Sequence, residues 1–267
     1  MDTHLSKVAD HHNFWSETYD SSYYDHFDLY HRITKENILQ YLPDKKDALI
    51  LDAGGGTGIW SIELAQLGYQ QIYLTDIAEK MIEKGHNKIN KLEFQDKITI
   101  KVSNICDMPE FEYEKFDFIL CEGDPLSYCG DYQKAMKELT RVLKSGGRLI
   151  ASVDNRVSVL GWLDKNEDPE EIDRILATGD IQMPNEKDEF RYFIHAFTPL
   201  ELRELFEEHG FIVDTIIGKP VIAHRFKWIR SKDSKFIEDI LKLEMKYNSH
   251  PDYISRGGHL EIVGTKR

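Results

Sequence analysis

The sequence has few cysteines and no long apolar run. Its three cysteines, Cys106, Cys121 and Cys129, form no Cys-x-x-Cys pair and are odd in number, so we expect reduced thiols rather than a disulfide framework. No apolar stretch approaches the roughly 18–20 residues that a membrane helix needs. The first residues also lack the basic-then-apolar character of a signal peptide. We therefore expect a cytoplasmic protein with no membrane partner.

Positive charge is also scarce. The 267 residues include 34 Lys and Arg against 47 Asp and Glu, which gives a formal net charge of −13. This balance disfavours a partner whose affinity depends on neutralising phosphates, so nucleic acid is not the expected ligand. The 41% of apolar residues and the chain length are typical of one large α/β domain with insertions. No motif indicates an oligomeric state.

The strongest local signal lies between residues 49 and 59, LILDAGGGTGI. Three apolar residues predict a short, buried parallel strand, and helical apolar spacing resumes over 59–65. An acid and four glycines stand between the two: Asp52, Gly54, Gly55, Gly56 and Gly58. Strand, glycine turn and helix in this order are typical of a nucleotide-binding βαβ unit, because glycines let the backbone turn with positive φ and approach a ligand.

The spacing of the glycines separates two classes of cofactor. A dinucleotide fingerprint, Gly-x-Gly-x-x-Gly, needs its third glycine at position 59, where this chain has Ile59. The pattern Asp52-x-Gly54-x-Gly56-x-Gly58 instead resembles the first motif of the class I S-adenosylmethionine (SAM)-dependent methyltransferases. An acid at the strand end would repel a pyrophosphate but suits the sulfonium and amino groups of SAM. A bare glycine turn in another α/β protein is the alternative.

Two further strand ends fit the same resemblance. Asp76 ends an expected strand over 71–75 and can accept hydrogen bonds from both hydroxyls of a ribose. The same acid would serve a nicotinamide cofactor, or cap the helix expected after it. A third strand is expected over 97–102, and the following residues 103–109 resemble the family's Gly-Asp-Ala-x-x-Leu-Pro segment. Asn104 stands there in place of the acid that meets the adenine amino group.

The resemblance implies a fold and a division of the chain. The expected fold is an α/β class, three-layer α/β/α sandwich with a mostly parallel seven-stranded sheet and helical cap insertions. Further strands are expected at 116–121, 148–153, 211–217 and 258–266, the last inserted antiparallel between the two before it. The domain would span residues 1–267: a helical cap at 1–47, a SAM-binding core at 48–153, insertions at 154–189 and 219–255, and the rest of the sheet at 190–218 and 256–267.

The same resemblance assigns SAM as the cofactor, with no metal. Residues expected at the cofactor lie on the glycine loop, at three strand ends and in the aromatic N-terminal segment: Asp52, Ala53, Gly54, Gly55, Gly56, Gly58, Asp76, Ile77, Asn104, Ile105, Cys121, Glu122 and Tyr19. Residues 1–12 are expected to be frayed. The aromatic residues that follow, among them Trp15, Tyr23 and Tyr24, either fold over the SAM pocket or dock a helix onto the sheet.

Helices outside the core are indicated by their caps and apolar spacing. A helix is predicted from about Asp28 to Leu42, another from Asp168-Pro169, another over 200–209 with Thr198 as its cap, and another near 235–247. Residues 134–143 also have amphipathic spacing and precede a glycine pair.

The expected function is transfer of a methyl group from SAM to a small molecule. Two insertions can form a lid, and the acidic surface disfavours RNA. Other possibilities are a protein or RNA methyltransferase, an NAD-dependent oxidoreductase or epimerase, and a non-catalytic SAM-binding subunit. The sequence assigns no catalytic residue, because no candidate has a partner close in sequence. The candidates on the acceptor side are Tyr24, His26, Asp124, Tyr128, Asn155 and His195.

Overall fold

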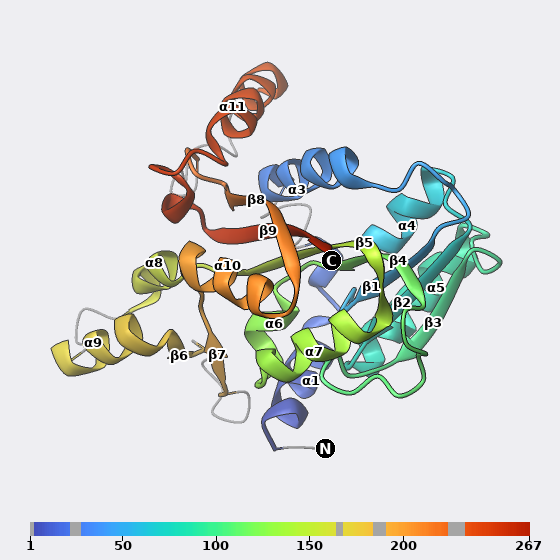
Figure 1. The fold of residues 1–267 in the computed structure, drawn as a ribbon, viewed down its shortest axis with the longest axis horizontal. Coiled ribbons are helices and arrows are strands. Elements are labelled where there is room, and N and C mark those ends of the chain that lie inside the picture. Colours follow the sequence, from blue (N-terminus) through green and yellow to red (C-terminus); the bar gives the residue numbers. More distant parts are fainter. Residues whose placement is uncertain (1–2, 22–27, 164–167, 184–190, 224–232) are drawn as a thin grey trace.

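A single seven-stranded sheet forms the centre of the protein, here described from a computed structural model (Figure 1). The structure describes residues 3–21, 28–163, 168–183, 191–223 and 233–267. The strands are β1 (Leu49–Ala53), β2 (Gln71–Asp76), β3 (Ile98–Val102), β4 (Phe116–Cys121), β5 (Leu143–Asp154), β8 (Phe211–Lys219) and β9 (His259–Lys266). Their order is β3-β2-β1-β4-β5-β9-β8, and β9 runs antiparallel between β5 and β8. The predicted fold class and the place of the last strand are confirmed.

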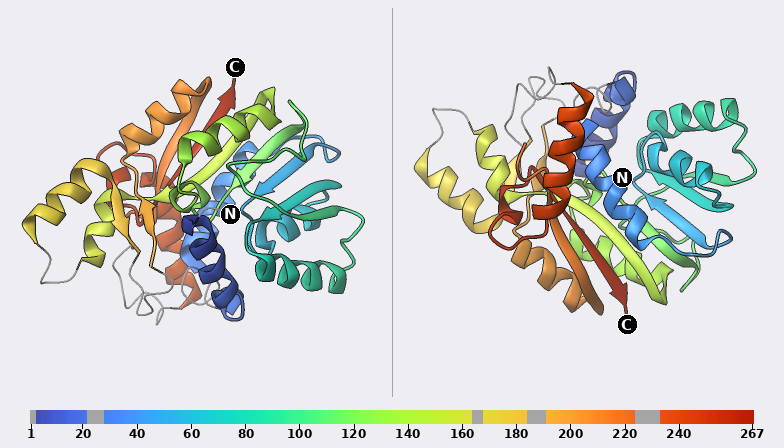
Figure 2. Two further views of the ribbon diagram at one scale, coloured as in Figure 1. Left: turned by 90° about the horizontal axis from the view of Figure 1, so that it is seen from below. Right: turned by 90° about the horizontal axis from the view of Figure 1, so that it is seen from above.

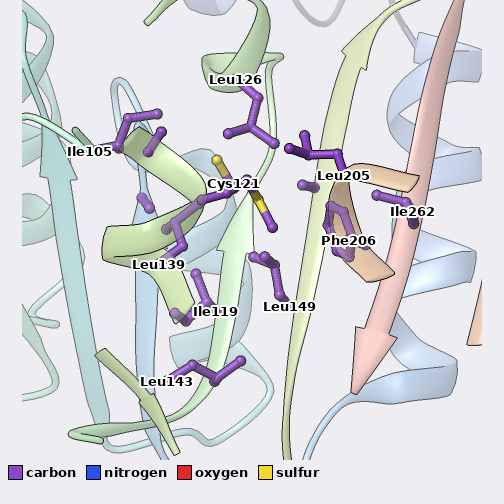
Figure 3. Packing of buried hydrophobic residues seen from close by; sticks show 14 of the residues in the cluster. Ile105, Ile119, Cys121, Leu126, Leu139, Leu143, Leu149, Leu205, Phe206 and Ile262 are labelled. Atoms are coloured by element: carbon purple, nitrogen blue, oxygen red, sulfur yellow. The ribbon is translucent and has the colours of Figure 1, made fainter. Parts of the chain in front are cut away.

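The central strands are buried on both faces because helices cover both. On one face lie α3 (Asp28–Tyr41), α4 (Ile59–Gln66) and α5 (Glu79–Lys91), which share a core with the side chains of Ile50 and Leu120. On the other lie α6 (Pro125–Tyr128), α7 (Tyr132–Val142) and α10 (Pro199–Glu208). Figure 3 shows this second core, where Cys121 packs among the apolar residues of β4, β5, α7 and α10.

Alternation along β1 decides which way each side chain points. Leu51 and Ala53 belong to the core under α7, whereas Ile50 belongs to the core under α4. Asp52 therefore points toward α4, since successive side chains of a strand face opposite sides. All of β1 from residue 50 onward is buried, as expected for the middle of a parallel sheet.

The predicted caps Thr198 and Asp168 are present, whereas Asp76 does not cap α5, whose N-cap residue is Ala78. Thr198 forms a capping box with Glu201 at the start of α10. Asp168 caps α9 (Pro169–Thr178), and Asp233 caps α11 (Ser234–Tyr247). Helix α11 packs on α3, and the two lie side by side in Figure 2 (right). The helix expected after β2 is α5, which runs to Lys91.

The prediction that residues 1–12 are frayed is wrong for residues 3–12, which the structure describes. They belong to helix α1 (Thr3–Trp15), whose Val8 and Ala9 are buried. The helix is held by distant residues: His4 Nε2 lies 3.0 Å from the carbonyl oxygen of Tyr128, and Asn13 accepts a hydrogen bond of 2.9 Å from the backbone of Lys80. Tertiary contacts therefore order a segment whose own composition is polar.

A small sheet that the sequence did not predict joins the first insertion to the residues that follow it. After β5 come α8 (Arg156–Val159), the 3-10 turn η1 (Leu160–Trp162), α9 and then β6 (Asp180–Gln182), which pairs antiparallel with β7 (Phe193–His195). These elements project from one side of the sheet (Figure 1). Ile181 and Tyr192 share an apolar cluster with Val8, so the small sheet supports α1.

A 3-10 turn, η4 (Ile254–Arg256), precedes β9. Within the described ranges, no helix is long and apolar enough to cross a membrane.

Candidate cofactor and acceptor site

The glycine loop leaves β1 at the carboxyl edge of the sheet and turns sharply into α4. Gly54, Gly56 and Gly58 have φ of +73°, +57° and +77°, a conformation that disfavours residues with a Cβ. The Gly55 N–H donates to the Thr75 carbonyl at 2.9 Å, which ties the loop to β2. Among the described residues, a Cβ added to Gly56 would meet only the Tyr19 ring, at 3.9 Å, so this glycine faces the cavity rather than packed atoms.

Asp52 does not line the space above the loop. Its Oδ2 accepts hydrogen bonds from the backbone N–H and hydroxyl of Ser61, at 3.1 and 2.6 Å. Its carboxyl group also lies 2.4–2.5 Å from where a Cβ of Gly55 would stand. Burial raises the pKa of Asp52 to about 6. Asp52, which was expected beside the sulfonium, therefore holds the first turn of α4 against the glycine loop. A side chain at position 55 would collide with the Asp52 carboxyl group, so a glycine is needed there.

A cavity of about 1070 Å³, including its open mouth, extends over the loop along the carboxyl ends of the strands. Seven residues expected at the cofactor line it: Tyr19, Gly54, Gly56, Asp76, Ile77, Asn104 and Ile105. They come from four separate segments, and the parallel strands bring them to one edge. The Tyr19 ring spans part of the cavity, since a Cβ on Gly123 would stand 3.9 Å from its hydroxyl.

The other residues expected at the cofactor lie behind the cavity wall. Ala53 and Cys121 are fully buried in the core of the sheet, and Gly58 packs on Leu74. Glu122 borders a smaller pocket beside Gly55, but its carboxyl group is buried in an ion-pair network. These residues, with Asp52 and Gly55, shape the wall without contributing a side chain to the main cavity.

The carboxyl group of Asp76 holds the backbone of the glycine loop and of the turn before α5, and it can still accept hydrogen bonds from a ligand. Its Oδ2 accepts the Gly56 N–H at 2.9 Å, and its Oδ1 accepts the Ala78 N–H at 2.8 Å. Each carboxylate oxygen has two lone pairs, so one on each remains for a ribose hydroxyl. Burial raises the pKa of Asp76, although these backbone hydrogen bonds oppose the shift.

Asn104 is placed to meet the far end of an adenosine. Its Oδ1 accepts the Cys106 N–H at 2.9 Å, which leaves the second lone pair of that oxygen for an amino group. The Cys106 thiol points away, toward the backbone carbonyl oxygens of Cys129 and Asp131 at 3.6 and 3.4 Å. All three cysteines are free and buried, as expected for small core residues.

The acceptor-side candidates separate into two groups. Asp124 and Tyr128 line the cavity, whereas Asn155 is a buried cap of α8. The imidazole of His195 lies between Asp180 and Glu201, at 2.8 and 3.0 Å, and joins β6 to α10. His195 is therefore structural. Tyr24 and His26 lie outside the described residues, as does Tyr23.

Several residues of the cavity were not singled out by the sequence. Leu5, Val8, His12 and Trp15 present one face of α1 to the cavity, with the helical spacing that would have revealed the helix. Tyr30 of α3, Met81 of α5 and His259 of β9 also line it. His259 could not be found from spacing, because only the fold brings the start of β9 beside the loop after β4.

The chemistry of the wall fits SAM better than a dinucleotide. Lys and Arg are absent from the described residues that line the cavity, so no permanently charged cation there would neutralise a pyrophosphate. The carboxyl groups of Asp76 and Asp124, which do line it, would repel a pyrophosphate. The open direction at Gly56 would also admit a ligand against the backbone.

The strand order, the glycine loop and this cavity define a class I SAM-dependent methyltransferase domain, and SAM is its cofactor. Residues 50–147, which hold the glycine loop, Asp76 and Asn104, match the methyltransferase domain family. A demethylmenaquinone methyltransferase from Bacillus mycoides is 28% identical over 134 residues, which cover 49% of this chain and 55% of that protein. The chain thus spans about half the length of the curated relatives that it matches.

Solved structures show the same fold across most of the chain. A SAM-dependent methyltransferase from Methanosarcina mazei has a TM-score of 0.59 and 23% identity, covering 86% of this chain and 96% of its own. The geranyl diphosphate C-methyltransferase from Streptomyces coelicolor, solved with Mg²⁺, geranyl diphosphate and S-adenosyl-L-homocysteine, has a TM-score of 0.58 and 15% identity. The match covers 89% of this chain and 79% of that one.

Proposed function

We propose that the protein transfers the methyl group of SAM to a small-molecule acceptor. One observation carries the proposal: a single cavity runs from the glycine loop and Asp76 to Asp124 and is covered by α1. The cofactor supplies an electrophilic methyl group. The residues near the loop would hold its adenosyl part, and those near Asp124 would hold the acceptor.

The cap favours a small acceptor over a macromolecule. Helix α1 contributes Leu5, Val8 and Trp15 to the wall. The segment after it is fixed over the glycine loop, where Asp20 accepts a hydrogen bond of 2.6 Å from the Thr57 hydroxyl and pairs with Lys88 at 2.8 Å. A covered cavity with aromatic walls limits the access of water and aligns donor with acceptor, which is the main demand of a direct displacement.

Transfer of labelled methyl groups tests this function. The protein would be incubated with methyl-labelled SAM and, in parallel, with small-molecule, RNA and protein fractions of a cell extract. We expect label in the small-molecule fraction. Label confined to RNA or protein would replace the proposed acceptor class with a macromolecule. SAM binding without transfer to any fraction would indicate a non-catalytic SAM-binding subunit.

A further inference from the structure

Three titratable side chains from three parts of the chain converge at the acceptor end of the cavity. Asp124 follows β4, Asp154 ends β5, and His259 begins β9. His259 Nδ1 lies 2.8 Å from Asp124 Oδ2 and 3.8 Å from Asp154 Oδ1. Asp124 and His259 line the cavity, and Asp154 lies behind them with 1% of its surface exposed.

The two carboxyl groups are incompletely satisfied. Asp124 is 94% buried, since 6% of its surface is exposed, yet its Oδ1 has no hydrogen-bond partner within the described ranges; the same holds for Oδ2 of Asp154. Buried carboxylate oxygens without donors are costly. Asp124 also has a left-handed backbone conformation, φ 65°, which is uncommon for a residue with a side chain and is found at functional sites. A ligand that donates a hydrogen bond would satisfy the Asp124 oxygen.

The surroundings favour a positively charged donor. Tyr30 packs edge-to-face on His259, with ring centroids 5.0 Å apart, and Trp15, Tyr19 and Tyr128 supply further aromatic surface. Aromatic faces attract cations. The buried cation Lys219 is held by ion pairs to Glu122 and Glu261, so these two acids offset most of its charge.

We propose that the methyl acceptor is an amine, which binds with its nitrogen at Asp124 Oδ1 and loses a proton to the group formed by Asp124, His259 and Asp154. This inference rests on the proposed function. The bound ammonium first gives up one proton, which passes from Asp124 by way of His259 to the carboxylate of Asp154, and this exposes the nitrogen lone pair. The lone pair then forms a bond to the methyl carbon while the C–S bond breaks and its electron pair stays on sulfur. The products are a methylated ammonium ion and S-adenosylhomocysteine.

The protonation of the cluster suits this step. Burial, with the nearby charge of Asp124, raises the pKa of Asp154 to about 7. Burial lowers the pKa of His259, but the two aspartates outweigh it and the net shift is upward, with Lys219 acting in the opposite direction. For Asp124, burial is outweighed by His259 and Lys219, which hold its pKa below the usual value. The cluster therefore keeps an ionised Asp124 at the cavity wall and has a group that titrates near neutral pH.

Two other cations are less well matched to the site. The three side chains offer ligand atoms within 4.8 Å of one another, which could hold a metal ion, but a hard divalent cation prefers six or more oxygen ligands. The sulfonium of SAM carries charge but has no proton to donate to Asp124 Oδ1. The amino group of SAM has such protons, and the SAM affinity of an Asp124 variant distinguishes it from an acceptor amine. An ammonium ion supplies both the charge and the donor.

The test identifies the atom that receives the label. Small-molecule products labelled from SAM would be separated on a cation exchanger at pH 7 and treated with alkali. We expect the label in retained, alkali-stable amines, formed equally well in the presence of EDTA. Label in ethers, esters or C-methyl products would overturn the amine proposal and leave the methyltransferase function standing, as would transfer that EDTA abolishes. No label in any fraction would refute the proposed function itself.

Variants of the cluster give the second readout. Asparagine tolerates positive φ, so Asp124→Asn keeps the backbone while it removes the charge. We expect kcat/KM for the identified amine to fall by about 10²–10⁴-fold, with SAM affinity within about threefold of the wild type. The exposed Asp96→Asn serves as the matched control and should change neither. His259→Gln should displace the neutral-pH limb of the kcat profile. Asp124→Asn with unchanged kcat/KM, or His259→Gln with an unchanged pH profile, would remove that residue from proton transfer.

Discussion

Substitution of Gly56 tests the glycine loop against a control that carries the same backbone penalty. Gly56 and Gly146 both have positive φ, at +57° and +77°. A Cβ at Gly56 would project toward the cavity and Tyr19, whereas a Cβ at Gly146 would meet no atom of the described residues within 4 Å. Alanine at either position should therefore cost about 1–2 kcal/mol of stability through the left-handed conformation. That corresponds to a Tm lower by about 2–8 °C.

Only the Gly56 variant should lose cofactor binding. The added methyl group would occupy space that the ligand needs, and overpacking of this kind costs about 1–3 kcal/mol. SAM affinity should then fall by about five- to 150-fold in Gly56→Ala, and more in Gly56→Val, while Gly146→Ala stays within about twofold of the wild type. Calorimetric titration with SAM and thermal melts of the same samples measure both quantities. Equal SAM affinity in folded Gly56→Val and wild-type protein would show that the cofactor does not lie against this loop.

Three other substitutions test individual carboxylates and a buried cation. Asp76→Ala should weaken SAM binding by about ten- to a hundredfold in calorimetry, or about 1.4–2.8 kcal/mol, whereas the control Asp96→Ala should leave it unchanged. Equal SAM affinities in the two variants would remove Asp76 from the site. Lys219→Met leaves two buried glutamates without their cation and should lower the free energy of unfolding by about 3–5 kcal/mol. The exposed control Lys242→Met should change that free energy by less than about 0.5 kcal/mol. Urea titrations measure both variants. Burial raises the pKa of Asp52 to about 6 in the folded protein, whereas the same carboxyl group has a pKa of about 3.9 in the unfolded chain. The folded state therefore loses about 3 kcal/mol of stability as the pH rises from about 4 to 6 and Asp52 ionises. Asp52→Asn should reduce the dependence of the free energy of unfolding on pH between about 4 and 6. The same pH dependence in the variant and the wild type would contradict the raised pKa of Asp52.

The parts of the fold that follow from local sequence could be predicted. A short apolar run before a glycine turn predicts β1, and Thr198-Pro199 with Glu201 three residues after the cap predicts the start of α10. These signals act within a few residues of each other. The order of the sheet came from the resemblance to a family, which the periodicity alone does not supply.

Long-range packing created the features that the sequence did not reveal. Helix α1 has a narrow apolar face and is held by contacts to Tyr128 and Lys80, which lie far along the chain. Strands β6 and β7 have three residues each and depend on their apolar cluster. For Asp52, the motif predicted the position in the chain but not the direction of the side chain. The pleat of β1 turns that side chain toward α4 and away from the cavity.

The acceptor site shows the same limit. Asp124 and His259 were far apart in the sequence, and neither residue had a partner by spacing. Their 2.8 Å approach exists because β9 inserts beside β5 and places its first residue opposite Asp154. A fold prediction could suggest that juxtaposition only after the register of β9 was known.

A crystal structure of the protein grown with excess SAM tests the central claim most directly. The account predicts an adenosyl group over Gly54–Gly56 with its ribose hydroxyls at Asp76, its adenine beside Asn104 and its sulfonium directed toward Asp124. An empty cavity at saturating SAM, or SAM bound elsewhere on the protein, would contradict it.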